Sequence, residues 1–332
     1  MPADALDVSG AWEGDNQDWW DWYVSLADNA DEPTQTAAVA LRPDPAAVAP
    51  LGDDALAREL AAPYAVPQCA IDAFRADGFV KLANVLSPGA VLRLRAKTIE
   101  TLEAAFSARL DGGLRNRFLS AEMLWLSDAV ARAFVLSPRI AKIAADLLGR
   151  PRVRLYHDNW MSKEPGCGRT PWHYDDHHFP LATNDVVTAW IPGQEIPRAM
   201  GPLAFARGME TWRRVADVPF NKEDASYDRR VAEIFRTENV DVEDGPFDVG
   251  AVSFHHNLSY HAAGGNRTGL SRAVLATTYF ADGARVVDAP TMVSGDWRKF
   301  LPGAEPGGLA ASPLNPICWP PGADGAREEP AQ

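Results

Sequence analysis

The chain has 332 residues, which is enough for one large domain or for one domain with appendages. Its formal net charge is −13, and so acidic a protein repels phosphate backbones and anionic membranes, so we expect neither nucleic acid nor a membrane as a partner. Its 3 widely spaced cysteines form no disulfide framework, the N-terminus lacks the pattern of a signal peptide, and we expect a soluble cytoplasmic protein.

Three regions are expected along the chain. Residues 1–50 form an N-terminal extension in which four tryptophans stand among acidic residues: Trp12, Trp19, Trp20 and Trp22. Exposing so many indole rings is unfavourable, so we expect the extension to cover the core of its own domain, with a homodimer contact as the alternative. Residues 51–290 are expected to form a single domain, and residues 291–332 a Pro/Gly-rich tail.

The first half of the expected domain is predicted to be mostly helical. Helices are expected from about residue 54 and over residues 67–77, 88–110, 121–136 and 138–148. Ser87 is the expected N-cap of the third helix, with Pro88 in its first turn. Gly149 is expected to end the last helix, and residues 79–86 are predicted to form a strand.

After Gly149, short β-type runs separated by Gly, Pro, Asn and Asp dominate the sequence. Six runs are expected to form strands: 153–162, 170–175, 185–192, 201–206, 251–261 and 272–281. Strands this short, without βαβ spacing, predict an antiparallel sandwich or barrel. Residues 212–242 are expected to form a partly helical insertion over its mouth. The expected fold class is mainly β with flanking α-helices, around a jelly-roll core.

The histidines point to a metal site. All 7 lie between His157 and His261. His173 and Asp175 flank Tyr174 in an expected strand, and because strand side chains alternate, these two point the same way. A His-x-Asp pair with one distant His is the ligand set of a facial triad, which leaves sites on Fe(II) open for a cosubstrate and O₂. The pattern therefore predicts an oxygenase, although His-x-Asp alone could equally be a polar strand end.

Three histidines compete for the position of third ligand. His261 is favoured over His255 and His256 because a Gly-rich turn and then Arg272 follow it. His255 and His256 are expected to support the site or to fill the core. Since arginine presents a planar fork that matches a carboxylate, Arg272 is expected to anchor the far end of a dicarboxylate cosubstrate, with a structural ion pair as the alternative.

Four segments in order carry a family resemblance over about residues 70–285: AFRADGFVKLANVLSPGAV, YHDNWMSKEPG, PWHYDDHHFPLATNDVVTAWIP and FHHNLSYHAAGGNRTGLSR. In this combination the chain resembles the phytanoyl-CoA dioxygenase family of Fe(II)/2-oxoglutarate oxygenases. The resemblance implies a double-stranded β-helix, a cupin-like jelly roll, with N-terminal helices packed outside it. It also implies that His173, Asp175 and His261 hold iron and that Arg272 holds 2-oxoglutarate.

Other positions are assigned less directly. The resemblance implies that Trp190 lines the cosubstrate pocket and that Asn159 lies near it, although Trp190 could equally be a core residue. Trp172, His177 and Phe179 are candidate substrate contacts in an aromatic-rich site, with burial in the core as the alternative for the two aromatic residues and loop solvation for His177.

The chain also departs from the family pattern. Ala263 stands where many relatives have a serine that helps to hold the cosubstrate carboxylate, and Arg207 or Met209 could reshape the substrate side. Neither change affects the expected metal ligands or Arg272. We therefore expect an enzyme that hydroxylates an aliphatic C–H bond of a small-molecule substrate and releases succinate and CO₂. Because Asp175 is present, hydroxylation is expected over halogenation. Desaturation, epoxidation, rearrangement, a non-catalytic binding protein or a metal-dependent hydrolase remain the alternatives.

Overall fold

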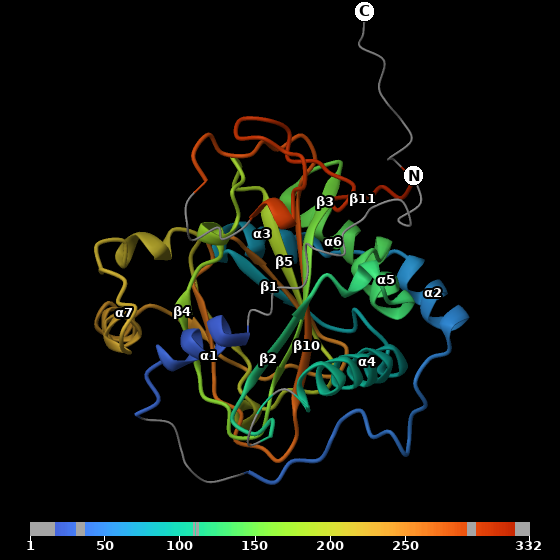
Figure 1. Cartoon of the computed structure of the whole chain (residues 1–332), viewed down its shortest axis with the longest axis horizontal. Coiled ribbons are helices and arrows are strands. Elements are labelled where there is room, and N and C mark those ends of the chain that lie inside the picture. Colours follow the sequence, from blue (N-terminus) through green and yellow to red (C-terminus); the bar gives the residue numbers. More distant parts are fainter. Residues whose placement is uncertain (1–16, 31–36, 109, 111–112, 291–296, 323–332) are drawn as a thin grey trace, which may run out of the picture.

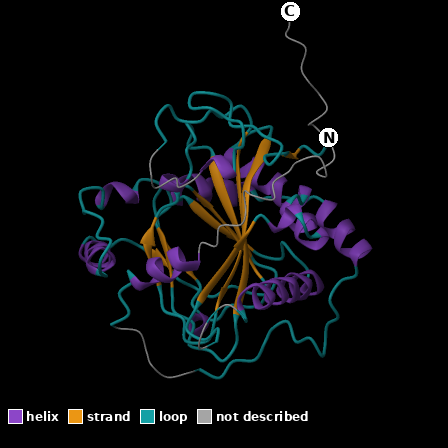
Figure 2. Ribbon diagram, in the orientation of Figure 1, coloured by secondary structure: helices purple, strands orange, loops and turns teal. Residues whose placement is uncertain are grey.

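The computed structural model describes residues 17–30, 37–108, 110, 113–290 and 297–322. Two antiparallel β-sheets form the centre of the molecule, and helices lie around them (Figure 1). Figure 2 shows the strands gathered in the middle, with long loops joining them. This arrangement confirms the expected fold class, a mainly β jelly roll with flanking α-helices. No helix in the described ranges is long and apolar enough to cross a membrane.

The larger sheet has seven strands in the described part of the chain, in the order β1-β8-β5-β10-β3-β11, with β2 also paired to β3. Their bounds are β1 (Phe79–Leu82), β2 (Phe118–Glu122), β3 (Val153–Lys163), β5 (Val186–Pro192), β8 (Val252–His256), β10 (Arg272–Ala281) and β11 (Ile317–Trp319). One face packs against helices, and the other faces the smaller sheet.

The smaller sheet has the order β4-β9-β6-β7, with bounds β4 (Thr170–His173), β9 (His261–Ala263), β6 (Leu203–Ala206) and β7 (Val242–Glu243). The run 251–261, expected as one strand, is divided between β8 of the larger sheet and β9 of this one. The turn between them is closed by a hydrogen bond of 2.8 Å from Ser259 N to His256 O. His255 and His261 therefore enter the space between the sheets from opposite sides.

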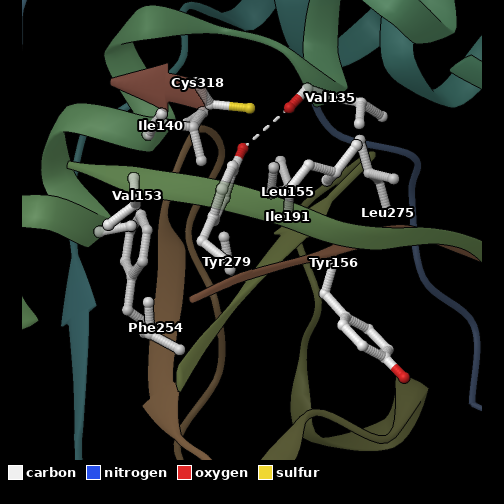
Figure 3. Packing of buried hydrophobic residues seen from close by; sticks show 14 of the residues in the cluster. Val135, Ile140, Val153, Leu155, Tyr156, Ile191, Phe254, Leu275, Tyr279 and Cys318 are labelled. Atoms are coloured by element: carbon white, nitrogen blue, oxygen red, sulfur yellow. Dashed lines mark hydrogen bonds between the residues drawn. The ribbon is translucent and has the colours of Figure 1, made fainter. Parts of the chain in front are cut away.

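The helices on the outer side of the larger sheet are α2 (Asp53–Ala61), α3 (Gln68–Asp77), α4 (Pro88–Phe106), α5 (Ala129–Val135) and α6 (Pro138–Leu148), with α2 packed on α5 and α6. Two of the predicted boundary residues act as expected. The Ser87 side chain accepts a hydrogen bond from Ala90 N at 3.3 Å, and Gly149 ends α6 in the left-handed conformation. Figure 3 shows the packing below α5 and α6, where the Tyr279 O–H donates to Val135 O at 3.0 Å.

The helix predicted over 121–136 is wrong for its first half. Glu122 ends β2, which pairs with β3. Met123 follows in the left-handed conformation, with a positive φ of 56°, and this ends the strand. The α-helix begins only at Ala129, after Asp128 Oδ1 accepts a hydrogen bond from Ala131 N at 2.8 Å. The spacing of apolar residues did not reveal the pairing with β3, which decides the structure of residues 118–122.

The N-terminal extension contributes helix α1 (Gln17–Ser25), which packs on β2 and β4. The Gln17 side chain donates to Phe118 O at 2.6 Å, and the Trp20 ring stacks on the Phe118 ring with centroids 4.5 Å apart. As its tryptophan content predicted, this part of the extension covers its own domain. Trp12 and the side chain of Trp19 lie outside the described residues.

The C-terminal segment differs from the expected tail. Its described part, residues 297–322, packs into the domain, and its strand β11 pairs with β3. The side chains of Leu301 and Leu314 are fully buried. Asn315 donates from Nδ2 to Leu155 O at 3.1 Å and to Phe300 O at 3.0 Å. These contacts depend on a few buried residues, and the Pro/Gly-rich composition of the segment gave no indication of them.

The insertion 212–242 is partly helical, as expected, and contains α7 (Ser226–Thr237). This helix lies beside β4 on the outer side of the smaller sheet (Figure 1). Phe235 of α7 meets the Trp172 ring edge-on, with centroids 5.1 Å apart. The insertion thereby gives the outer face of the smaller sheet its own apolar layer.

Candidate metal and cosubstrate site

Two strand ends bring three potential metal ligands together. His173 of β4 lies directly opposite His261 of β9 in the sheet register, and Asp175 follows two residues after His173. Their ligand atoms all lie within 4.8 Å of one another. Asp175 Oδ1 is 3.7 Å from the Nε2 atom of each histidine. The structure thus assembles the His-x-Asp pair and the distant His predicted from the sequence.

Backbone carbonyl groups fix the orientation of both imidazoles. His173 Nδ1–H donates to Pro171 O at 2.8 Å, and His261 Nδ1–H donates to Ser259 O at 2.9 Å. Because a carbonyl can only accept, Nδ1 carries the proton and the Nε2 lone pair is left for a metal. Burial lowers the pKa of both rings, which favours the neutral form that binds a metal.

Asp175 is held as a carboxylate by its neighbours. Its backbone N–H donates to Asn257 O at 2.9 Å, and His255 Nε2–H donates to Oδ2 at 3.3 Å. Burial acts to raise the pKa of this carboxyl group, but His261, His255 and His173 outweigh burial and lower the pKa below its usual range. His255 therefore supports Asp175, one of the roles expected for it.

The donor set fits a divalent iron ion. Two neutral imidazole nitrogens and one carboxylate oxygen, all on one side of the space between the sheets, form the facial arrangement of non-haem Fe(II) oxygenases. The second ring nitrogen of each His ligand is already hydrogen-bonded to the backbone, which is the usual support for metal-binding histidines.

Arg272 is a buried cation, and none of the described residues supplies it with an anionic partner. It is 2% exposed, its Nη1 donates to Gly201 O, and its Nε has no hydrogen-bond partner. No acidic side chain of the described residues forms an ion pair with it, so the alternative of a structural ion pair finds no support there. Burial lowers the pKa of Arg272 to about 10, so the group stays charged at neutral pH. Because a buried unpaired charge is costly, the site fits an anionic ligand.

The backbone around Arg272 is tightly packed. Gly201 has φ +75°, and a Cβ atom there would lie 2.1 Å from Gly264 O, so only glycine allows this approach. The buried Nζ of Lys163 donates to Gly264 O at 2.9 Å and to Gly168 O at 2.8 Å. Lys163 thus ties together the loops beside the arginine.

One cavity of about 510 Å³ joins the triad to Arg272. Trp190 lines it and lies beneath the Arg272 guanidinium, with 5.4 Å from Cζ to the ring centroid. Asn159 also lines it, and its Oδ1 accepts from Ser120 Oγ at 2.7 Å. Ala263 also lines the cavity. It stands at the position where the family that this sequence resembles commonly has a serine. The structure therefore brings together the residues expected to hold metal and cosubstrate.

Of the three residues expected to contact the substrate, Phe179 lies at the cavity, and Trp172 and His177 do not. Phe179 lines the cavity. Trp172 does not appear among the lining residues, because strand alternation turns it to the opposite face of β4, towards Phe235. His177 is exposed and lies against the Tyr174 ring, with centroids 4.3 Å apart, while the next residue, His178, lines the cavity instead.

Sequence reasoning missed several lining residues. They come from α1, β2, β3 and the C-terminal segment: Trp20, Tyr23, Glu122, Tyr156, His157, Lys299 and Phe300. The Tyr23 ring approaches the His173 ring edge-on, with centroids 5.6 Å apart. His157 could have been found, because it stands two residues before Asn159 in a strand. The others depend on contacts between distant segments.

Comparison with protein families gives a match to phytanoyl-CoA dioxygenase (PhyH) over residues 74–274, which is more than half of the chain. This range contains the three metal-ligand candidates and Arg272. Comparison with curated protein sequences gives no significant match.

Solved structures share the fold. The α-ketoglutarate-dependent carbocyclase SnoK from nogalamycin biosynthesis is 23% identical, with a TM-score of 0.61 over 77% of this chain and 99% of that chain. The epimerase SnoN, in complex with Fe³⁺, α-ketoglutarate and nogalamycin RO, is 22% identical, with a TM-score of 0.59 over 76% of this chain and 98% of that chain. EctD from S. alaskensis, with 2-oxoglutarate and 5-hydroxyectoine, is 19% identical, with a TM-score of 0.54 over 86% and 96%.

Proposed function

The chain belongs to the phytanoyl-CoA dioxygenase family of Fe(II)/2-oxoglutarate oxygenases, and we propose that it hydroxylates an aliphatic C–H bond of a small or medium organic metabolite. The observation that carries this proposal is a single cavity containing both the His173–Asp175–His261 cluster and Arg272, a buried arginine that pairs with no acidic side chain of the described residues. Such a cavity suits a ligand that reaches a metal at one end and carries a carboxylate at the other.

The side chains have separate tasks in this proposal. His173, Asp175 and His261 would hold Fe(II), and Arg272 would bind the distal carboxylate of 2-oxoglutarate above Trp190. When bound, the iron with 2-oxoglutarate and O₂ supplies the oxidation: the keto acid becomes succinate and CO₂, and one oxygen atom enters the substrate C–H bond. The protein orients the substrate and limits the entry of water.

The reaction outcome depends on where the substrate lies. Asp175 keeps a carboxylate in the ligand set, which favours hydroxylation over the transfer of an external anion. The related folds include an enzyme described as a carbocyclase and one described as an epimerase. Hydroxylation is the simplest outcome for a substrate whose C–H bond faces the triad, and it is the reaction we propose here.

The direct test measures succinate formed by purified protein with Fe(II), 2-oxoglutarate and air. We expect succinate in equal amount to CO₂, and none under nitrogen or after chelation of the metal. Folded, iron-loaded protein that forms no succinate in air, even in the presence of a broad set of metabolites, would contradict the proposed activity.

The N-terminal helix α1 forms one wall of this cavity. Trp20 and Tyr23 line it, and α1 is fastened by an ion pair of 2.5 Å between Asp21 and Arg117. Trp22, on the same helix, does not appear among the lining residues; its indole N–H donates to Lys222 O at 2.9 Å. The two tryptophans therefore form a matched pair for mutation.

We expect Trp20→Ala to open the cavity to water and to raise succinate formation without substrate several-fold, because solvent exclusion limits unproductive turnover. Trp22→Ala, which removes an equally large ring outside the cavity, should leave this rate near that of the wild type. Succinate assays at saturating 2-oxoglutarate measure both rates. Equal rates in the two variants would mean that α1 does not close the site.

A further inference from the structure

A β-bulge in β3 turns two neighbouring side chains into the cavity. In the pairing with β10, Thr278 lies opposite His157 but Tyr279 lies opposite Leu155, so Tyr156 is the extra residue. Leu155 packs in the core below the helices. Tyr156 and His157 both line the cavity, which strict alternation would not allow. In Figure 3 the Tyr156 hydroxyl points away from the Tyr279 hydroxyl, which faces Val135.

These two side chains are part of an aromatic group that we call the aromatic end of the cavity: Tyr156, His157, Phe179 and Phe300. The Tyr156 ring meets Phe179 edge-on at 5.0 Å between centroids and lies 5.5 Å from Phe300. The His157 ring lies 5.0 Å from Phe300. Aromatic faces and edges at these spacings suit a substrate ring, because ring pairs gain stability at centroid distances of about 4.5–7 Å.

Two polar atoms at the aromatic end find no hydrogen-bond partner among the residues that the structure describes. Tyr156 Oη and His157 Nδ1 are both buried and unsatisfied, and Tyr156 as a whole is 1% exposed. An unsatisfied buried polar group costs about 1–3 kcal/mol, so a ligand that pairs with both atoms would be favoured. Burial raises the pKa of Tyr156 and lowers the pKa of His157, so both groups are neutral near pH 7. A hydroxyl group matches this pair, because it can accept from Tyr156 O–H and donate to His157 Nδ1.

The charges in the cavity disfavour a polyanionic substrate. Among the described residues that line it, the cations are Arg272 and Lys299. Arg272 is assigned to the cosubstrate, and Lys299 Nζ forms an ion pair of 3.2 Å with Glu122 Oε2. The pair adds no net charge beside the aromatic end, so a substrate carrying several phosphate groups would find no matching cations there.

We propose that the aromatic end binds the hydroxyl-bearing ring of an uncharged substrate, an aromatic or alicyclic alcohol, through Tyr156 Oη and His157 Nδ1. This rests on the proposed function, because it names the substrate class of that same cavity. Tyr156 and His157 would then be specificity-determining residues that hold the ring while another part of the substrate faces the metal ligands.

Calorimetric titration of the metal-free full-length protein tests the proposal without turnover. Phenol, cyclohexanol and 2-naphthol are compared with benzene, cyclohexane and naphthalene. At least one alcohol should bind more tightly than its hydrocarbon. Tyr156→Phe should weaken the binding of that alcohol about tenfold, which corresponds to about 1.4 kcal/mol, and should leave the affinity for the hydrocarbon unchanged. Tyr279→Phe is the matched control, because it removes a hydroxyl that donates to Val135 O outside the cavity.

Thermal unfolding of the same variants gives a readout that needs no ligand. Tyr156→Phe removes an unsatisfied hydroxyl and should keep or raise the Tm, whereas Tyr279→Phe loses a made hydrogen bond and should lower it. The proposal is overturned if no alcohol is preferred over its hydrocarbon by the wild type, or if Tyr156→Phe weakens both members of a pair equally. These outcomes are independent of oxygen-dependent succinate formation, which tests the proposed function by itself.

Discussion

Alanine in place of Asp175 is expected to lower oxygen-dependent succinate formation more than about a hundredfold. Mutation of residues that only hydrogen-bond to metal ligands already lowers metal affinity or activity about 10–100-fold. Asp175 is itself a ligand candidate and the one anion in the ligand set. The carboxylate lies 3.7 Å from Nε2 of both His173 and His261, so its removal leaves two neutral donors for a doubly charged ion. We therefore expect metal affinity and activity to fall together.

Asp176→Ala is the matched control for this variant. The neighbouring carboxylate accepts a hydrogen bond from Asn257 Nδ2 at 2.7 Å and does not appear among the cavity-lining residues. Its loss should leave Fe(II) affinity within a few-fold of the wild-type value. Equilibrium dialysis with Fe(II) under nitrogen, beside the succinate assay, measures both properties. An Asp175→Ala protein that binds iron and turns over like the wild type would remove Asp175 from the site.

Arg272→Ala is expected to raise the KM for 2-oxoglutarate about a hundredfold. Truncating one member of a buried charged pair costs about 2–5 kcal/mol, and tenfold in affinity corresponds to about 1.4 kcal/mol. The guanidinium is buried, and in the described part of the chain no carboxylate pairs with it, so a bound ligand would be its anion. Arg272→Lys should recover part of the affinity, because it keeps the charge but loses the planar fork.

A shorter keto acid separates binding of the distal carboxylate from a general loss of structure. 2-Oxobutanoate keeps the keto acid but lacks the second carboxylate, so Arg272 has nothing to hold at that end. The wild type should strongly prefer 2-oxoglutarate, and Arg272→Ala should reduce this preference to near equality. Succinate and propionate formation, measured over a range of each keto acid, give the two KM values. A preference that survives the mutation would show that another group binds the distal carboxylate.

The central part of the site was predictable because it depends on local geometry. Strand alternation turns His173 towards the cavity, and the turn after His261 leads directly to Arg272. Asp175, expected in the same strand, lies just beyond the end of β4 in a helical conformation (φ −86°, ψ −15°), where only its short spacing from His173 keeps it beside the histidines. The helices with clear boundary residues, such as the one that Ser87 caps, were predictable for the same reason. The reading of Trp172 as a substrate contact overlooked this alternation, since its neighbour His173 already faces the cavity.

The remaining features depend on contacts between segments far apart in the chain. Pairing with β3 makes residues 118–122 a strand, although a helix was predicted to begin at residue 121. The bulge at Tyr156 is visible only in the register with β10. Trp20 and Phe300 reach the cavity from outside the expected domain, and no local pattern indicates where such segments pack. The boundaries of the expected domain, 51–290, stay a prediction.

His173, Asp175 and His261 are proposed to hold an Fe(II) ion that 2-oxoglutarate chelates. Anaerobic titration of the metal-free protein, first with Fe(II) and then with 2-oxoglutarate, examines this assignment without turnover. We expect the visible charge-transfer band of the chelate to appear in the wild type and to be lost in His261→Ala. Folded wild-type protein that gives no band, or a His261→Ala variant that keeps it, would contradict the assignment of this site.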